Sequence, residues 1–303
     1  MLGSGFDAED AVQETMVRAW RAREGFEGRS SVRSWLYRIA TNMCLDMLHG
    51  RQRRARPMEL GPSRPPVESS LEALLPEGSW ISPIADERVL PPEADPAEVA
   101  VARDSIRLAF ISALQHLPAR QRAALLLCEV LRWQAAEAAE LLGTSVAAVN
   151  SALQRARTTL ISVEADAAPA TIDAEHRALL TRYVDAFERY DIDSLVTLLH
   201  EDAVQSMPPF AMWLRGGDDI GRFMLGPGAG CRGSRLIPKA ANGCPAFGHY
   251  KPDPQGGHAP WALQVLEISG NRIAGIHSFL DTDRLFPEFG LPARLPAQAG
   301  QAE

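Results

Sequence analysis

Several features are scarce in this sequence of 303 residues, and each scarcity excludes a class of protein. There is no run of about 18 apolar residues, so we expect no membrane-spanning helix and no membrane partner. The first residues, MLGSGFDAED, carry neither a basic segment nor an apolar core, so we expect no signal peptide. The four cysteines are scattered, which excludes a disulfide framework and predicts a cytoplasmic location.

Lysine is almost absent, since only Lys239 and Lys251 accompany 29 arginines. The formal net charge of −7 argues weakly against a nucleic-acid binder, but the charge is distributed unevenly. Residues 1–56 carry 10 arginines against 7 acidic residues, and 101–165 carry 7 against 5. Residues 57–100 carry 2 arginines against 9 acidic residues. Two basic segments separated by an acidic one are expected where only the basic segments meet phosphate groups.

The stretch 133–160, WQAAEAAELLGTSVAAVNSALQRARTTL, has the pattern of two short helices joined by a tight turn. Gly143 can adopt the left-handed conformation that ends the first helix, and Ser145 can cap the second. Val146, Val149 and Leu153 recur at a spacing that predicts a buried side. The outer face of such a helix–turn–helix would enter a DNA major groove, although an ordinary helical hairpin explains this stretch alone equally well.

Two helices are expected near the N-terminus. Residues 6–23 predict an amphipathic helix whose buried stripe is Val12, Met16, Ala19 and Trp20. A second helix, capped by Ser31, is expected to run from Val32 to about Arg53. It ends in more arginines than a helix C-terminus needs, so we favour phosphate contact by Arg51, Arg53, Arg54 and Arg56 over stabilisation of the helix dipole.

The segment 57–96 is an acidic linker rich in proline, glutamate and serine, with little periodicity. Within it, 71–86 contains a tryptophan and several branched aliphatic residues, which predicts that this piece docks on a folded surface.

After a short hinge the pattern changes to one or two helices over 174–200 followed by strand-like pieces among glycine and proline. The strands are expected at 203–207, 213–215, 236–241, 261–268 and 272–280, with a tight turn at 269–271. Helices followed by a long antiparallel sheet predict an α+β domain.

Three motifs in order carry a family resemblance: DAEDAVQETMVRAWR (7–21), RSSVRSWLYRIATNMCLDMLHGRQRR (29–54) and LPARQRAALLLCEVLRWQAAEAAELLGTSVAAVNSALQRAR (117–157). Together they resemble an extracytoplasmic-function sigma factor of the sigma-70 family, the first two its region 2 and the third its region 4. The segment 172–290 resembles a SnoaL-like domain, the α+β cone of the nuclear-transport-factor kind.

The resemblance implies a multidomain fold, with all-α sigma region 2 and region 4 followed by an α+β SnoaL-like cone domain. The expected domains are an N-terminally incomplete region 2, an acidic linker, region 4 with the helix–turn–helix, the SnoaL-like domain and a tail. Their ranges are 1–56, 57–96, 97–163, 172–290 and 291–303.

The implied function is that of a sigma factor that directs core RNA polymerase to promoter DNA and starts transcription, with the C-terminal domain modulating this activity in cis. No enzyme activity, no cofactor and no metal are expected. Two alternatives stay open: a SnoaL-like enzyme, and a one-component DNA-binding regulator that senses a ligand.

The resemblance also implies roles for individual residues, and stacking with phosphate contacts is how single-stranded DNA is held. The polymerase-binding residues would be Asp7, Asp10, Gln13, Glu14 and Val17. Contacts to the −10 element would come from Arg29, Arg33, Trp35, Tyr37, Arg38, Asn42, Arg51, Arg53 and Arg54. Contacts to the −35 element would come from Thr144, Ser145, Ala147, Ala148, Asn150, Ser151, Gln154, Arg155 and Arg157.

The sequence departs from the family pattern in three ways, one of which is the additional C-terminal domain. It begins within what resembles the end of the first region 2 helix, so most of that helix is expected to be absent. Positions of the recognition helix that are usually basic or larger are Ala147, Asn150 and Ala152 here. Fewer phosphate contacts predict weak −35 binding by this helix alone.

A SnoaL-like cone has a cavity, for which the candidate lining residues are Trp213, His258, His277 and Asp281, with His249, Trp261 and Asp283 near them in the pattern. An Asp/His pair could serve acid–base catalysis, or the cavity could hold a small ligand that is not identified, or the domain could contact only protein. Cys231, Cys244, His249 and His258 have no compact metal-ligand spacing. GPGAGCRG (226–233) is interpreted as a flexible loop because it lacks the ending of a phosphate-binding loop.

Overall fold

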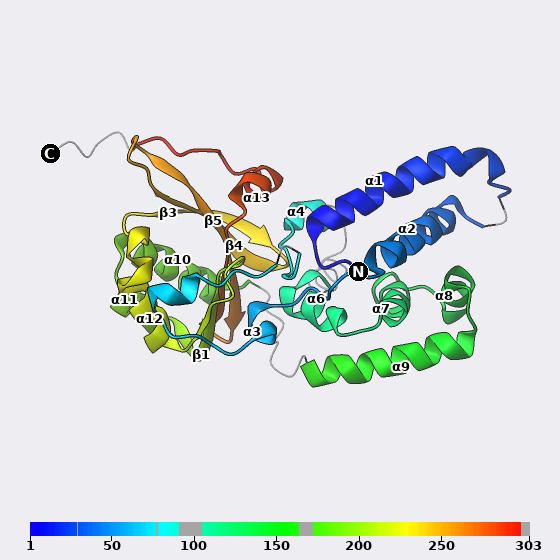
Figure 1. Cartoon of the computed structure of the whole chain (residues 1–303), viewed down its shortest axis with the longest axis horizontal. Coiled ribbons are helices and arrows are strands. Elements are labelled where there is room, and N and C mark those ends of the chain that lie inside the picture. Colours follow the sequence, from blue (N-terminus) through cyan, green and yellow to red (C-terminus); the bar gives the residue numbers. More distant parts are fainter. Residues whose placement is uncertain (29, 77, 91–104, 164–171, 298–303) are drawn as a thin grey trace. The chain divides into compact units, whose positions relative to one another are not determined.

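The computed structural model describes residues 1–28, 30–76, 78–90, 105–163 and 172–297. The chain divides into two compact units (Figure 1). The helical unit comprises Met1–Ala55 and Asp104–Asp166, and the C-terminal unit comprises Arg56–Arg103 and Ala167–Glu303. In the described ranges, no helix combines the length and the apolar character needed to cross a membrane. The hinge expected at 164–170 lies outside the described residues.

The helical unit begins with α1 (Gly5–Ala22), the short η1 (Arg23–Gly25) and α2 (Val32–Leu48). Each α-helix starts at a serine cap: Ser4 Oγ accepts from Asp7 N at 3.3 Å, and Ser31 Oγ accepts from Ser34 N at 3.0 Å. Helix α2 ends five residues before the expected Arg53, because Gly50 has a positive φ of 73° that interrupts the helical path.

The stripe that α1 buries differs from the one expected. Ala11, Thr15 and Ala19 face α2, whereas Val12, Met16 and Trp20 are 54%, 54% and 68% exposed. Of the expected stripe, only Ala19 is buried. Small residues at i, i+4 and i+8 let the two helices approach closely, so the larger apolar side chains are left outside.

The second half of the helical unit consists of α6 (Leu108–Gln115), α7 (Ala119–Leu125), the π-helical turn η3 (Leu126–Val130), α8 (Ala135–Leu142) and α9 (Val146–Val163). Its core collects apolar side chains from all of these helices, among them Leu114, Leu125, Leu141, Val149 and Leu153. Val146, which was expected to be inward, is 44% exposed because it lies in the first turn of α9.

Arg122 is a buried cation that joins the parts of this unit. Its guanidinium donates to Gln115 Oε1 at 2.8 Å, to Leu117 O at 3.2 Å and to Met1 O at 2.5 Å. Burial, aided by the nearby positive charge of Arg53, lowers the pKa of Arg122 to about 10. Since these acceptors are neutral oxygens, hydrogen bonds rather than an ion pair compensate the burial of Arg122.

The C-terminal unit contains one six-stranded sheet in the order β2-β1-β6-β5-β4-β3. The strands are β1 (Leu199–Ser206), β2 (Trp213–Arg215), β3 (Arg235–Ala241), β4 (Cys244–Pro252), β5 (His258–Ser269) and β6 (Arg272–Phe279). The tight turn at 269–271 joins β5 and β6 as expected. The sheet is antiparallel except that β1 runs parallel to β6, which the sequence pattern did not predict.

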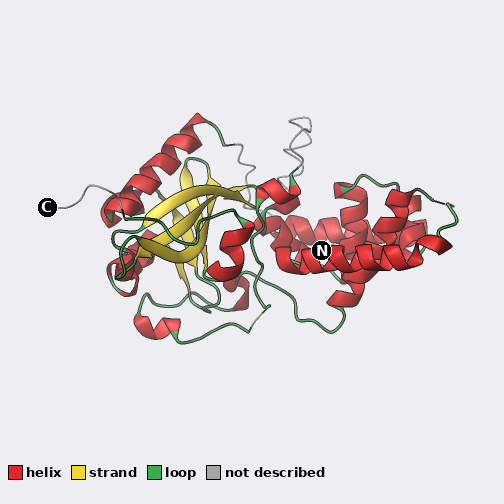
Figure 2. Cartoon of the chain, turned by 90° about the horizontal axis from the view of Figure 1, so that it is seen from above, coloured by secondary structure: helices red, strands yellow, loops and turns green. Residues whose placement is uncertain are grey.

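One face of the sheet is covered by α10 (Ala174–Arg189), α11 (Ile192–Thr197) and α12 (Gly217–Leu225), which is followed by η4 (Pro227–Cys231) (Figure 2). Large side chains from these helices meet the sheet in one core, including Tyr183, Phe187, Ile220 and Phe223. Helix α13 (Thr282–Glu288) packs on β5, where Phe286 meets Tyr250 at 5.1 Å between ring centroids. The expected order, helical regions followed by an α+β domain, is confirmed.

The linker packs along this domain, as the composition of 71–86 predicted. It carries the short helices α3 (Pro57–Leu60), η2 (Glu68–Leu71) and α4 (Asp86–Val89). Leu75 N donates to Pro209 O at 2.7 Å, and Ala211 N donates to Ala73 O at 2.8 Å. Further along, Ile84 pairs through both backbone groups with Asn242, and Asp86 Oδ1 accepts from Gly243 N at 2.8 Å.

The last described residues, 291–297, also pack on the sheet. Leu291 is buried beside Gly248, where an added Cβ would lie 2.7 Å from the leucine side chain. Leu295 exchanges two backbone hydrogen bonds of 2.9 Å with His258 at the start of β5. The segment therefore adds a short edge pairing to the sheet.

Candidate functional site

The helix–turn–helix is formed by α8 and α9. Gly143 takes the left-handed conformation (φ 60°, ψ 44°), and Thr144 N donates to Ala139 O at 2.9 Å across the turn. Ser145 Oγ accepts from Ala148 N at 3.2 Å and so caps α9. Both roles agree with the prediction from the sequence.

Val149, Leu153 and Ala156 bury one side of α9, which leaves the predicted −35 residues on the other sides. The exposed members are Thr144, Ser145, Ala147, Ala148, Asn150, Gln154, Arg155 and Arg157, and Ser151 is half-buried. Arg155 donates to Ser151 Oγ at 2.7 Å along the helix, whereas Arg157 pairs with Glu129 of η3. Within the described residues, Arg155 is thus held by a neutral hydroxyl on the same helix rather than by a carboxylate.

The predicted −10 residues lie on α2 and just after it. Phe26 packs against Trp35 with ring centroids 4.9 Å apart, and Arg33 lies over the ring of Tyr37 at 5.7 Å. Asn42 is exposed, and Arg29 lies outside the described residues. The aromatic and basic side chains that the prediction needs are therefore half-buried or exposed along one helix.

The predicted −10 arginines that follow α2 contact other residues of the helical unit. Arg51 and Arg54 both pair with Asp7 Oδ2, at 3.0 and 2.9 Å, and Arg53 contacts the ring of His116. Asp7, predicted to bind polymerase, is thereby committed to two arginines in this conformation. These arginines could contact DNA phosphates only after their contacts with Asp7 and His116 break.

Regions 2 and 4 meet inside the helical unit. Tyr37 packs edge-on against Trp133 with centroids 5.6 Å apart and joins the core around α7 and α8. Arg38 pairs with Glu140 of α8 at 2.9 Å. Two side chains predicted to contact −10 DNA are thus engaged with the helix–turn–helix half of the same unit.

The predicted polymerase-binding residues lie on α1. Asp10, Gln13 and Val17 are exposed, and Glu14 pairs with Arg18 one turn away at 2.9 Å. They adjoin the exposed Val12, Met16 and Trp20, so the outer face of α1 combines polar and large apolar side chains. Such a mixed surface is typical of a protein–protein interface.

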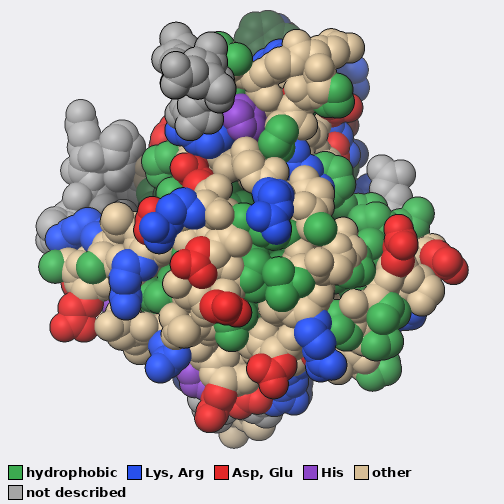
Figure 3. All heavy atoms as spheres, turned by 90° about the vertical axis from the view of Figure 1, so that its left-hand side faces the viewer, with side chains coloured by type: hydrophobic (Ala, Val, Ile, Leu, Met, Phe, Trp, Pro, Cys, Tyr) green, Lys and Arg blue, Asp and Glu red, His purple; other side chains and the backbone are tan. Residues whose placement is uncertain are grey.

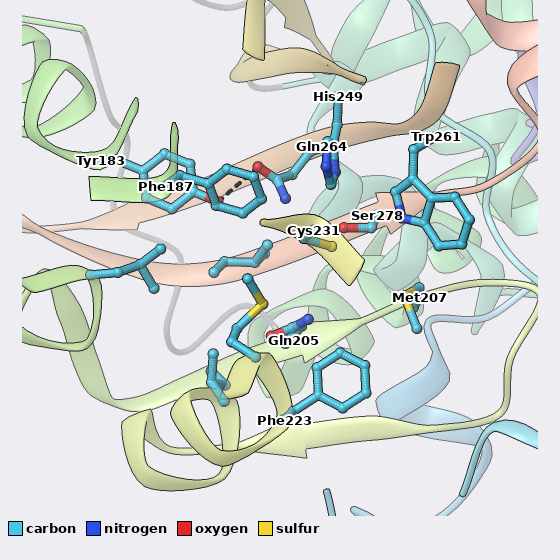
Figure 4. A pocket seen from close by; sticks show the side chains of 14 residues that line it. Tyr183, Phe187, Gln205, Met207, Phe223, Cys231, His249, Trp261, Gln264 and Ser278 are labelled. Carbon is cyan, nitrogen blue, oxygen red and sulfur yellow. Dashed lines mark hydrogen bonds between the residues drawn. The ribbon is translucent and has the colours of Figure 1, made fainter. Parts of the chain in front are cut away.

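The C-terminal unit contains a cavity of about 30 Å³ between the sheet and α10, α11 and α12 (Figure 4). Apolar and aromatic side chains form most of its wall. The polar side chains on it are Tyr183, Gln205, His249, Gln264 and Ser278, with the thiol of Cys231. Trp261 and His249, which the pattern placed near the cavity, do line it.

The four residues expected to line the cavity lie elsewhere. Trp213 Nε1 donates to the linker carbonyl of Gly61 at 2.8 Å, and His258 Nε2 contacts Gly233 O at 3.0 Å. Asp281 precedes α13, and His277 points to the opposite face of the sheet from Ile276 and Ser278, because side chains alternate along a strand. The described residues contain no Asp/His pair in this cavity and no group of three or more potential metal ligands.

His277 instead belongs to a polar cluster on the other face, which comprises Arg56, Ser206, Glu267 and His277. His277 Nδ1 hydrogen-bonds Ser206 Oγ at 2.8 Å, its Nε2 lies 3.3 Å from Glu267 Oε2, and Arg56 donates to the same carboxylate oxygen at 2.9 Å. Burial alone would raise the pKa of Glu267, but Arg56 and His277 outweigh it and hold this pKa well below its ordinary value. The cluster fixes Arg56, the residue just before the linker, to the sheet.

Sequence reasoning missed Gln205, Gln264 and Glu267, three polar residues that alternate with or neighbour apolar residues in β1 and β5. A buried polar side chain in such a strand needs a partner or a ligand, and this alternation was the available signal. Which face each residue occupies follows from the strand register, which the sequence pattern did not give for β1 and β4.

We expect Arg56→Ala to destabilise the C-terminal unit at neutral pH by about 1–3 kcal/mol, because the Glu267 carboxylate loses its charged donor. A carboxyl group with a lowered folded pKa contributes stability above its ordinary pKa and loses it as the pH falls. The difference between wild type and variant in urea unfolding should therefore be largest near pH 7 and shrink once the pH falls below about 5, toward and below the ordinary pKa of glutamate. The control is Arg215→Ala, which breaks an exposed pair with Asp202 in the same unit. A difference that does not change with pH would contradict the role assigned to Glu267.

Comparisons with known proteins agree with this geometry. Residues 1–54 match the family Sigma-70 region 2, and residues 107–160 match Sigma-70, region 4. The ECF RNA polymerase sigma factor SigG of Mycobacterium tuberculosis is 48% identical over 303 residues, covering 97% of this chain and 80% of that protein. SigJ of the same organism is 30% identical over 237 residues, covering 75% of this chain and 67% of that protein.

A crystal structure of the extracytoplasmic-function sigma factor SigJ of Mycobacterium tuberculosis has a similar fold, with a TM-score of 0.58 at 24% identity. The similarity covers 96% of this chain and 93% of that chain, so it includes both units. The chain belongs to the extracytoplasmic-function sigma factors of RNA polymerase.

Proposed function

We propose that this sigma factor uses the outer face of α1 to bind core RNA polymerase, α2 to hold the −10 element and the exposed side of α9 to read the −35 element. The observation that carries the proposal is the helix–turn–helix, whose capped second helix turns its polar side chains to solvent. The partners are core RNA polymerase and promoter DNA, and the site of action is the cytoplasm, where transcription takes place.

For α1, the proposed polymerase-binding residues are Asp10, Gln13, Glu14 and Val17, with Asp7 after release from its arginines. The exposed Val12, Met16 and Trp20 support the proposal, because the area they expose is available for burial by a partner. The polymerase surface that meets them should combine apolar area with basic groups.

For DNA, we propose a division of roles. Arg33, Trp35, Tyr37, Arg38 and Asn42, with Arg29, would meet the −10 element after the contacts with Trp133 and Glu140 open. Arg51, Arg53 and Arg54 would supply phosphate contacts after leaving Asp7 and His116. Most of the exposed −35 side chains are small and neutral, so we infer that polymerase places α9 on the DNA and that this helix binds weakly alone.

We further propose that the C-terminal domain modulates transcription in cis through the linker, without catalysis. Support comes from the hydrogen bonds that hold 73–86 on the domain, since this segment connects the two promoter-reading regions. The cavity wall contains no carboxylate, and burial lowers the pKa of His249 to about 3. A neutral histidine without an acidic partner is a poor acid–base pair, which supports a role other than that of an enzyme.

The polymerase face can be tested with Val17→Glu. Val17 is 42% exposed, so the change should leave the fold intact but would place a charge in the interface. We expect at least about a tenfold loss of affinity for core RNA polymerase, measured by fluorescence anisotropy with labelled sigma factor. Val67→Glu is the matched control, because this linker valine is similarly exposed at 44%. Equal affinity of the two variants would count against the assignment of α1.

The −35 face can be tested with Arg155→Ala in the holoenzyme. Loss of one phosphate contact should weaken promoter binding at all −35 sequences and reduce the slope of log K against log salt by about 1. Filter binding at several salt concentrations measures this slope. Arg189→Ala is the control, since it removes an exposed arginine that pairs with Asp185 in the C-terminal unit. An unchanged slope for Arg155→Ala would remove this residue from the DNA interface.

Modulation through the linker can be tested with Asp86→Ala, which removes the acceptor for Gly243 N. The released segment should be cleaved faster by trypsin after Arg88. A longer free linker also lowers the effective concentration of region 4 near the promoter when region 2 is bound. Each doubling of the free length costs about 0.6 kcal/mol, which is about threefold in the binding equilibrium. We expect about threefold less transcript from a promoter that needs both elements.

Glu87→Ala is the control for the linker test, because this exposed residue neighbours Asp86 in α4. Faster cleavage of Asp86→Ala with unchanged transcript would refute modulation through the linker. It would leave the identity of the protein as a sigma factor intact.

A further inference from the structure

The cavity of the C-terminal domain is lined almost entirely by buried side chains. Of its fourteen lining side chains, thirteen are buried and Trp261 is 36% exposed, so Trp261 marks the mouth. Lys251 covers the ring of Trp261, with its ammonium 3.2 Å from the ring centroid. The free space of about 30 Å³ exceeds the roughly 10–15 Å³ that one water needs.

Gln205 carries a buried polar atom on this wall that has no partner among the described residues. It lies on β1, is 6% exposed, and its Oε1 has no hydrogen-bond partner within the described part of the chain. Figure 4 shows its side chain directed into the space also bordered by Cys231, Gln264 and Ser278. A buried amide oxygen without a donor is costly, so the site is suited to a molecule that supplies one.

The other polar groups on the wall are paired or uncharged. Tyr183 donates to Gln264 Oε1 at 2.7 Å, and His249 hydrogen-bonds Ser234 at 2.9 Å. Burial, aided by Lys251, keeps His249 neutral by lowering its pKa, and burial raises the pKa of the Cys231 thiol. No lining side chain carries a charge at neutral pH, and the ammonium of Lys251 lies at the mouth, over Trp261 and beside the Cys231 thiol. An ion deeper in the cavity would therefore lack a charged partner on the wall.

We propose that this cavity binds a small, uncharged, mainly apolar molecule whose hydroxyl or N–H group donates a hydrogen bond to Oε1 of Gln205. The aromatic and aliphatic wall disfavours ions and strongly polar molecules, whereas the buried, unpaired Oε1 of Gln205 favours a ligand with a donor. This assignment concerns a binding site and stands whether or not the domain modulates transcription.

The wall can adapt to a molecule larger than the free space. Met207 and Met224 line it with flexible, polarizable side chains, which adjust to ligands of different shape. Trp261 at the mouth is partly exposed, and the ammonium of Lys251 covers its ring from outside. Entry therefore requires movement of side chains at one end of the cavity rather than opening of the sheet.

The test compares three probes of similar size on the full-length chain: phenol, toluene and benzoate. Phenol is neutral with a donor, toluene is neutral without one, and benzoate is an anion. Ligand-observed NMR titration gives each dissociation constant. We expect phenol to bind about tenfold or more tightly than toluene, because only phenol satisfies Gln205, and benzoate to bind weakest.

Three results with the wild type would overturn the proposal. Absence of binding by all three probes would show that the cavity is not a binding site. Equal affinity for phenol and toluene would remove the role of the acceptor, and preference for benzoate would contradict an uncharged ligand.

Variants connect the binding to the cavity. Gln205→Met keeps the side-chain length but removes the acceptor, so the affinity for phenol should fall to that for toluene. Gln255→Met is the matched control, since this glutamine is exposed in the turn before β5, and it should bind like the wild type. Met224→Phe fills the space by a second route and should weaken phenol and toluene together. Unchanged phenol binding in both cavity variants would place the site elsewhere and overturn the assignment.

Discussion

The arrangement of the C-terminal unit depends on the pairing between the linker and the turn that joins β3 to β4. Asn242 is fully buried, and a positive φ of 55° directs its backbone and side chain to the same neighbour. Its N–H donates to Ile84 O at 3.1 Å, and its Oδ1 accepts from Ile84 N at 3.0 Å. Because buried backbone groups must find partners, this exchange holds the linker to the sheet edge. Without it, the acidic and proline-rich composition of the linker would favour an extended free chain.

The linker is held to the C-terminal unit at three further places, although its composition is that of a free chain. Its start is fixed by Arg56 on the Glu267 carboxylate, its middle by backbone pairing near Pro209, and its end by Asp86. The face of this unit in Figure 3 mixes basic, acidic and apolar side chains rather than presenting one sign of charge. That distribution suits contacts with protein segments better than contacts with phosphate, and it agrees with the negative net charge of this part of the sequence.

In the helical unit, the residues that α1 buries against α2 are small. Alanine and threonine fill that interface, so valine, methionine and tryptophan remain outside on α1. Meanwhile Tyr37 and Arg38 find partners in the region 4 half. The unit thus pairs with its own residues two side chains that we propose to meet the −10 element. Binding then exchanges one set of contacts for another, and only the difference between the two sets contributes to affinity.

The sequence by itself determined the family, the order of the regions and the capped helix–turn–helix, because local signals such as Gly143 and Ser145 act within a few residues. It also indicated from composition that 71–86 would dock. It did not give the buried stripe of α1, since helical periodicity does not say which of two adjacent stripes meets a partner. The parallel pairing of β1 with β6 and the strand β4 were likewise missed.

Tertiary structure decided which polar residues share a site. His277 and Gln205 lie on neighbouring strands, yet the alternation of side chains puts one beside Arg56 and the other in the cavity. One step in register would have exchanged them. Pairing partners far apart in the chain, such as Ser206 with His277 and Ile84 with Asn242, are set by long-range contacts that no local pattern encodes.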